Sequence, residues 1–233
     1  MLTSSNHRQH PGLFIVFEGV EGSGKTTQID RLEDWLMTVQ SAPVVRTREP
    51  GGTDLGTQIR SLLLDVKSRD PISDRAELLL FAADRAQHVD QLIRPKLESG
   101  AIVLCDRFTM STIAYQGYGR GLDVEIIQHL NAIATAGIVP DLTIWLDLDP
   151  AVGLRRAHDR GVVNRMDGES LEFHRRVRQG YCAVAAESAQ RGDRLWRIDA
   201  SATVEAITHD LQAVILRLVH QKQTPSPSSP SVS

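Results

Sequence analysis

Short apolar runs alternate with longer amphipathic stretches along most of the chain. Five runs have the length and the β-branched content of buried strands: residues 13–17, 44–46, 102–105, 142–148 and 195–198. Because helix-length segments separate them, we expect right-handed crossover connections and a parallel sheet. The runs are apolar throughout rather than alternating, which is typical of strands covered on both faces.

Apolar positions in the intervening segments recur every three or four residues. After the first run they fall at Ile29, Leu32, Leu36 and Val39. The same spacing predicts further helices over 55–65, 74–97, 123–136, 150–159, 169–189 and 203–220. Pro95 should kink or end the helix at 74–97. The pattern therefore predicts an α/β fold of three layers, with a five-stranded parallel sheet and helices on both faces.

Both ends of the chain differ from its middle in composition. Residues 1–11 are polar and end in Pro11, and residues 223–233 are rich in serine and proline. Such segments cannot bury enough apolar surface to become ordered, so we expect two disordered tails. Residues 12–222 are then one domain of ordinary size.

Composition limits the partners and the compartment of this protein. Of 233 residues, 41% are hydrophobic and 24% are charged, and the net charge is −3. No broad basic surface for nucleic acid or for an anionic membrane is therefore expected. Two cysteines cannot build a disulfide framework. The first apolar run leads into glycines rather than a cleavage site, so we expect a cytoplasmic protein.

A glycine-rich loop follows the first predicted strand and precedes the first predicted helix. Residues 19–26 read G-x-x-x-x-G-K-T in full. In such a loop backbone amides surround phosphate oxygens, Lys25 reaches the terminal phosphates and the Thr26 hydroxyl can bind Mg²⁺. We therefore expect a P-loop NTPase fold. The residues expected to bind ATP here are Gly22, Ser23, Gly24, Lys25, Thr26 and Thr27.

The loop alone does not choose between a kinase, a GTPase switch and a motor ATPase. A GTPase carries Asn-Lys-x-Asp and Asp-x-x-Gly, yet no asparagine here precedes a lysine and no aspartate has a glycine three residues later. The short chain also argues against a motor with additional domains. These observations favour a small kinase.

Two strand ends carry candidates for the acceptor side. Arg48, in Thr-Arg-Glu-Pro-Gly-Gly-Thr after the second run, offers a planar fork for phosphate, and Glu49 could orient it or bind metal through water. An ordinary turn is the alternative. Asp106 ends the third run near the expected Mg²⁺, with Arg107 beside it. A strand-end salt bridge would explain that pair equally well.

Arginines cluster again between residues 155 and 165. They are Arg155, Arg156, Arg160 and Arg165, with Gly161 among them. The phosphate loop has no arginine at residues 20–23, so a mobile lid at about 155–168 would supply catalytic cations, Arg160 first and Arg155 second. A solvated helix face is the alternative, and we assign Arg175, Arg176 and Arg178 to such a face.

Taken in order, the motifs resemble the bacterial thymidylate kinase family. EGVEGSGKTT, TREPGGT, LLFAADRAQH, DRF with STIAYQG, and the arginine lid cover residues 13–201. The resemblance implies transfer of the γ-phosphoryl group of ATP to dTMP, giving dTDP and ADP for dTTP biosynthesis, with Mg²⁺. It also implies a homodimer, with apolar helix faces such as 74–97 as candidates for its interface.

The resemblance further assigns roles in binding the acceptor base. Phe81 would stack on thymine, and Arg85, four residues later on one helix face, would hydrogen-bond its edge. Thr112 and Gln116 would add base contacts.

For the sugar and the phosphate, Tyr115 would crowd the 2′ position and Glu21 would meet the 3′-hydroxyl. Arg48 and Arg107 would hold the acceptor phosphate. Asp199 belongs to a segment that resembles the adenine-side loop of the family.

One position departs from the family pattern, because His158 stands where close bacterial relatives usually have arginine. Either Arg155 and Arg160 suffice, or closure of the lid is pH-sensitive. Two other functions stay open from the residues: a deoxynucleoside kinase, which would need a base at the 5′-hydroxyl, and a nucleotide-binding regulatory protein without catalysis. The acceptor arginines argue against the deoxynucleoside kinase, because its acceptor carries no phosphate. The complete phosphate loop argues against a regulatory protein without catalysis.

Overall fold

The computed structural model describes residues 10–65, 71–159, 161 and 164–223. Most of the two expected tails, and Arg160 of the expected lid, lie outside the described residues.

The five predicted strands form one parallel sheet in the order β2-β3-β1-β4-β5. They are β1 (Leu13–Glu18), β2 (Val44–Arg48), β3 (Ile102–Asp106), β4 (Leu142–Asp147) and β5 (Leu195–Asp199). The parallel sheet and its strand positions confirm the expected fold. β1 lies between β3 and β4, and the chain runs from β1 to β2 on one side of the sheet and later crosses from β3 to β4 on the other side. Ligands of such folds bind at this point, beyond the carboxyl ends of the strands.

The edge strands correct one expectation. The three central strands are buried almost throughout, but β2 and β5 are largely half-buried or exposed. Trp196 of β5 is 42% exposed. Each edge strand has one neighbour only, and its outer part is not fully covered by helices. The expectation of strands apolar throughout therefore holds for β1, β3 and β4 alone.

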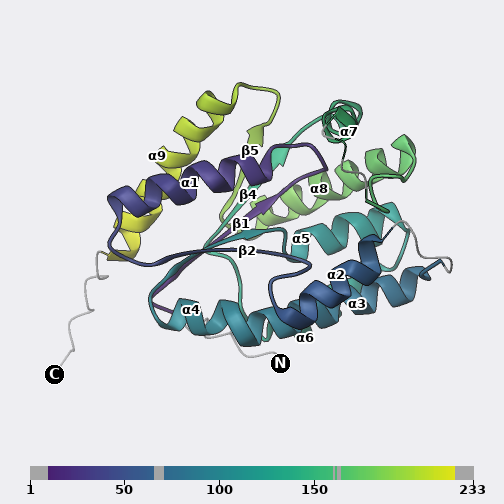
Figure 1. Ribbon diagram of the computed structural model, residues 1–233, viewed down its shortest axis with the longest axis horizontal. Coiled ribbons are helices and arrows are strands. Elements are labelled where there is room, and N and C mark those ends of the chain that lie inside the picture. Colours follow the sequence, from purple (N-terminus) through teal and green to yellow (C-terminus); the bar gives the residue numbers. More distant parts are fainter. Residues whose placement is uncertain (1–9, 66–70, 160, 162–163, 224–233) are drawn as a thin grey trace.

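Helices cover both faces of the sheet, as Figure 1 shows, so the three layers are confirmed. On one face α1 (Lys25–Val39), α8 (Leu171–Arg191) and α9 (Val204–Gln223) pack on Leu13, Ile15 and other side chains of that face. On the other face the neighbours of Phe14 and Val16 come from the segment around residues 89–97. Further helices are α2 (Asp54–Leu64), α6 (Val124–Thr135) and α7 (Pro150–Asp159).

The helix predicted at 74–97 does not end at Pro95. It runs as α3 (Asp74–His88), a π-helical turn η1 (Val89–Ile93) and α4 (Arg94–Glu98). Proline lacks an N–H and its ring clashes with the carbonyl four residues earlier in an α-helix, and the wider π turn directly before Pro95 avoids that clash. A second π-helical segment, η2 (Ile113–Gly119), follows the short helix α5 (Thr109–Thr112), and the periodicity did not predict either element.

A polar clasp joins the two ends of the domain at the amino ends of the strands. Asp141, just before β4, accepts a hydrogen bond from the backbone N–H of Phe14 at 2.8 Å. Lys222 near the end of α9 donates to the Gly12 carbonyl oxygen and pairs with Asp141. In the described part of the chain no helix is both long and apolar enough to cross a membrane.

Candidate active site

The phosphate-binding loop joins β1 to α1. Gly22 and Gly24 have φ angles of 72° and 92°, which glycine adopts without strain. The buried Lys25 ammonium donates to the carbonyl oxygens of Gly19 at 3.1 Å and Val20 at 3.0 Å. Burial lowers the pKa of Lys25, and the nearby Arg107 lowers it further. Ser23 is buried in the loop, and Thr26 and Thr27 are exposed in the first turn of α1.

Arg107 links this loop to the wall of an adjoining pocket. Its guanidinium donates to the Gly19 carbonyl oxygen at 3.0 Å and to the Tyr115 hydroxyl at 3.3 Å, and it pairs with Glu21 at 3.4 Å. The guanidinium also lies 5.0 Å from the centre of the Tyr115 ring. Three predicted acceptor residues therefore lie together beside the phosphate loop, as expected.

The turn that aims Arg107 is held by Glu18, a residue that the sequence reasoning missed. The buried Glu18 carboxylate accepts from the N–H of Phe108 at 2.9 Å, from the Ser111 hydroxyl at 2.5 Å and from the Tyr181 hydroxyl at 3.1 Å. Burial raises the pKa of Glu18. A charged residue at the end of an apolar strand was the available signal, and its partners in α5 and α8 were not predictable.

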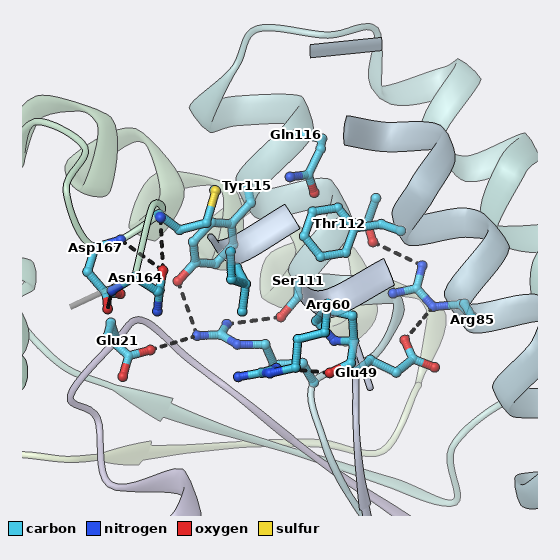
Figure 2. Close-up of a pocket in the computed structure, with 15 residues that line it drawn as sticks. Glu21, Glu49, Arg60, Arg85, Ser111, Thr112, Tyr115, Gln116, Asn164 and Asp167 are labelled. Atoms are coloured by element: carbon cyan, nitrogen blue, oxygen red, sulfur yellow. Dashed lines mark hydrogen bonds and ion pairs between the residues drawn. The ribbon is translucent and has the colours of Figure 1, made fainter. Parts of the chain in front are cut away.

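A pocket opens between α2, α3, η2 and residues 164–167 (Figure 2). Eight predicted residues line it: Glu21, Glu49, Phe81, Arg85, Arg107, Thr112, Tyr115 and Gln116. The structure thus brings together nearly all of the expected acceptor site. The exception is Arg48, which is exposed at the end of β2 and does not line the pocket.

Arg85 is anchored by protein groups at the end of the pocket that α3 and Thr112 form. It is 2% exposed and donates to Glu49 Oε2 at 2.8 Å, to Thr112 Oγ1 at 2.9 Å and to the Phe108 carbonyl oxygen at 2.8 Å. A further bond reaches Asn131 at 2.6 Å. The guanidinium is therefore a rigid part of the pocket wall.

Glu49 plays a different part from the one expected. Its Oε2 accepts from Arg85 and its Oε1 lies 3.0 Å from His88 Nδ1. Both carboxylate oxygens are thus engaged away from Arg48. The structure does not support the expectation that Glu49 orients Arg48 or reaches a metal ion; it positions Arg85 instead.

Asp84 and His88 support the loop that follows β2. Asp84 Oδ1 accepts from the Gly51 N–H at 3.0 Å, and His88 Nε2 lies 2.6 Å from the Thr47 hydroxyl. Burial raises the pKa of Asp84 to about 6, and the neighbouring Glu49 raises it as well. These two side chains therefore fix the position of the loop after β2. The sequence reasoning did not single out either of them.

Arg60 of α2 is a second arginine of the pocket that the sequence reasoning missed. Its Nη1 donates to the Pro50 carbonyl oxygen at 2.9 Å, and its side chain lines the pocket. Burial and the nearby Arg48 lower the pKa of Arg60. It is the one basic residue within α2, and a lone cation on a helix whose only other charged residue is Asp54 was the available signal.

The lid arginines that the structure describes, Arg155, Arg156 and Arg165, do not form one cluster. Arg155 is exposed on α7, and His158 is exposed on the same helix. Arg156 donates to the Ala200 carbonyl oxygen at 3.3 Å. Arg165 donates to the Leu63 carbonyl oxygen at 2.7 Å and also bonds a buried glutamate of α3, so its expected place among mobile lid cations is wrong.

Two of the arginines assigned to a solvated face are also engaged. Arg178 forms a bidentate pair with Asp147 at 2.8 and 3.1 Å, and Arg176 donates to the Gly119 carbonyl oxygen at 2.8 Å. Of these three, Arg175 fits the expectation, since among the described residues its ion pair is with Glu172 of its own helix, at 3.6 Å on an exposed surface.

The segment expected on the adenine side turns sharply after β5. Asp199 is exposed, and its Oδ1 accepts from the Ser201 N–H at 2.9 Å. The Ala200 N–H donates to the Asp147 carbonyl oxygen at 2.9 Å, and Ala200 also receives Arg156 from α7. The turn therefore lies against the lid helix.

Of the three residues expected at Mg²⁺, Asp106 and Thr26 carry oxygen atoms that suit that ion, whereas both carboxylate oxygens of Glu49 are engaged elsewhere. Among the described residues, Asp106 Oδ1 is buried without a hydrogen-bond partner, and such an orphaned acceptor suits a cation or its water. In the described part of the chain no group of three His, Cys, Asp or Glu side chains is arranged to hold a metal ion by itself. Mg²⁺ commonly takes one or two protein ligands together with substrate phosphates and water.

The fold and this site define the class of protein: a phosphate loop with a buried lysine, a strand-end aspartate and an arginine-lined pocket mark a P-loop kinase. Residues 17–211 match the family described as "Thymidylate kinase". The chain is 55% identical to the thymidylate kinase of Trichodesmium erythraeum, covering 88% of this chain and 96% of the relative. It is 56% identical to that of Desulfovibrio desulfuricans, covering 77% and 85%.

A solved structure agrees with these sequence relatives. The crystal structure of thymidylate kinase from Ehrlichia chaffeensis superimposes with a TM-score of 0.71 at 35% identity, covering 88% of this chain and 98% of that one. This chain belongs to the thymidylate kinase family.

Proposed function

We propose that this enzyme transfers the γ-phosphoryl group of ATP to dTMP, giving dTDP and ADP. The observation that carries the proposal is the placement of Arg107. It bonds the phosphate loop through Gly19 and lines the adjoining pocket, so it stands between a donor and an acceptor. An acceptor that already carries a phosphate explains a cation at this point.

The chemistry requires positioning rather than a strong base. A phosphomonoester has its second pKa near ~6, so its oxygens are already ionised at neutral pH. Two anions must then approach in line, and fixed cations offset their repulsion. Lys25 serves the donor side, and Arg107 with Arg60 serves the acceptor phosphate. The exposed Arg48 and the lid residues Arg155 and Arg160 would reach the phosphates when the lid closes.

Mg²⁺ is the proposed metal, held by Thr26 and Asp106 with the phosphates of ATP. When bound, the ion neutralises part of the charge on the β- and γ-phosphates. Asp199 and the turn at Ala200 would receive the adenine of ATP.

The remaining pocket residues suit an acceptor with a pyrimidine base and a deoxyribose. Phe81 offers a ring face for stacking, and Thr112 with Gln116 contributes polar atoms. The Tyr115 hydroxyl, held by Arg107, would crowd a 2′-hydroxyl, and Glu21 would accept from the 3′-hydroxyl.

A coupled assay of ADP release tests the proposal against its alternatives. We expect turnover with dTMP, less with dUMP, and none with thymidine or without an acceptor. Turnover with thymidine but not with dTMP would point to a deoxynucleoside kinase. Binding of ATP without turnover of any acceptor would point to a regulatory protein.

We further propose that the enzyme is a cytoplasmic homodimer. Five large apolar side chains are exposed on α2, α3 and α6, which pack on one another: Leu55, Leu62, Leu79, Ile126 and Ile133. A second copy would cover them. Both cysteines are free, as a reducing compartment allows. Light scattering should give twice the chain mass, and Leu79→Glu should shift it towards the monomer.

A further inference from the structure

Glu77 is a fully buried carboxylate that lies behind the pocket wall and does not line the pocket itself. It lies in the first turn of α3 and is 0% exposed. Gln116 Nε2 donates to Glu77 Oε1 at 2.8 Å, and Arg120 Nη2 donates to Oε2 at 3.2 Å. Arg165 also donates to Oε2. The partners come from η2, from the residue that directly follows η2 and from the segment at residues 164–169.

These partners belong to walls of the acceptor pocket. Gln116 lines the pocket itself, and Arg165 lies between Asn164 and Met166, which also line it. Arg120 continues the connection, because it pairs with Glu169 at 2.6 Å. Glu77 therefore ties α3, η2 and residues 164–169 together at the base end of the pocket.

The bond from Gln116 determines which way its amide points. An ionised carboxylate can only accept hydrogen bonds, so the amide nitrogen must face Glu77. Burial would raise the pKa of Glu77, but the bonds from the two arginines and Gln116 outweigh burial and hold it below its ordinary value. The carboxylate thus stays ionised, and the amide oxygen is left on the Thr112 side of the pocket (Figure 2).

An amide oxygen in this place selects among pyrimidines. Thymine and uracil carry an N–H donor at ring position 3, whereas cytosine presents a lone pair there, which would face the oxygen. Resting on the proposed function, we propose that Glu77 is a positioning residue for base specificity. By fixing the Gln116 amide with its oxygen inward, it makes the pocket accept a base with an imide N–H and reject cytosine.

The substitution Glu77→Gln tests this role, because glutamine can donate as well as accept and lets the Gln116 amide reverse. We expect the ratio of kcat/KM for dTMP over dCMP to fall about tenfold or more, chiefly through KM. A wild-type ratio in folded E77Q overturns the proposal. Asp74→Asn is the matched control. Asp74 lies in the same turn, half-exposed and 3.5 Å from Arg120, and an equal fall in D74N would also overturn the proposal.

If circular dichroism shows that E77Q is unfolded, the same test can be made with two other variants, R120M and the double variant E77Q/R120M. Arg120→Met retains the contact between Glu77 and Gln116, whereas E77Q/R120M removes the carboxylate without leaving an extra buried charge. The dTMP preference should be at least tenfold lower in the double variant than in R120M, and equal preferences overturn the inference. Absence of dTMP turnover in the wild-type enzyme would instead refute the proposed function.

Discussion

Gly22 at the tip of the phosphate loop packs directly against Gly153 in the first turn of α7. A Cβ atom built on Gly22 would lie 2.1 Å from the Gly153 carbonyl oxygen, and one built on Gly153 would lie 2.2 Å from the Glu21 carbonyl oxygen. Neither backbone atom can move aside without moving its whole element. The phosphate loop and the helix that leads into the lid therefore share one backbone contact.

Replacing Gly153 with alanine should separate these two elements. We expect kcat/KM for ATP to fall about tenfold or more, which corresponds to about 1.4 kcal/mol of lost transition-state stabilisation. Steady-state kinetics would measure this. Gly168→Ala is the control, because a Cβ there meets no atom nearer than 3.5 Å and should leave kinetics near wild type. Equal kinetics for both variants would contradict the coupling.

Arg60→Met should weaken acceptor binding selectively. Methionine retains an apolar stem near Gly51 but removes the guanidinium from the pocket. Loss of a charge-assisted bond to phosphate should raise KM for dTMP by about 10- to 100-fold, with a smaller change in kcat. Arg31→Met removes an exposed arginine that pairs with Glu205 and should change neither constant. An unchanged KM in R60M would exclude the assigned role.

Removal of Mg²⁺ should stop turnover while dTMP still binds. Excess EDTA would abolish ADP release, and calorimetry should detect dTMP binding in the same buffer. In Asp106→Asn the Mg²⁺ concentration for half-maximal rate should rise about tenfold, because the orphaned carboxylate oxygen loses its charge. A wild-type Mg²⁺ dependence in D106N would remove Asp106 from the metal site.

Arg160 lies outside the described residues, and its catalytic role stays a prediction. Arg160→Ala should lower kcat about a hundredfold or more, since a cation delivered to the transferred group acts mainly in the transition state. Binding of dTMP should change far less. Arg175→Ala, on the exposed surface of α8, is the matched control. A normal rate in R160A would transfer the role to another lid residue, with Arg155 the next candidate.

The raised pKa of Asp84 predicts a dependence of stability on pH. Its value of about 6 when folded exceeds that of an unfolded aspartate, so the folded protein binds more protons between about pH 4 and 6. This group's contribution to stability is therefore lost as pH rises through that window. Relative to wild type, Asp84→Asn should gain about 1–2 kcal/mol between pH 4 and pH 7 in denaturant melts. A pH-independent difference would contradict the assignment.

The sheet and the phosphate loop were predictable because their signals are local. The apolar runs are contiguous, and the loop from Gly19 to Thr26 is a single motif between a strand and a helix. Glu49 was misjudged for a geometric reason. Successive side chains of an extended segment point to opposite sides, so Glu49 turns away from Arg48 and towards α3.

The partners of the arginines could not be predicted from the chain. Arg165 meets its carboxylate 88 positions away, and Arg178 meets Asp147 31 positions away. Charge runs alone look the same whether they are solvated or paired. Arg60 was missed for the opposite reason. A single arginine in a helix gives only a weak sequence signal of a binding site, and only the structure shows that its side chain lines the pocket.

The clasp of Lys222, Asp141 and Gly12 has a practical consequence. It gathers the two ends of the domain at the amino ends of the strands, while the phosphate loop and the pocket lie at the carboxyl ends. The enzyme can therefore be tethered to a bead or a sensor chip through either terminus with its catalytic edge facing the solution.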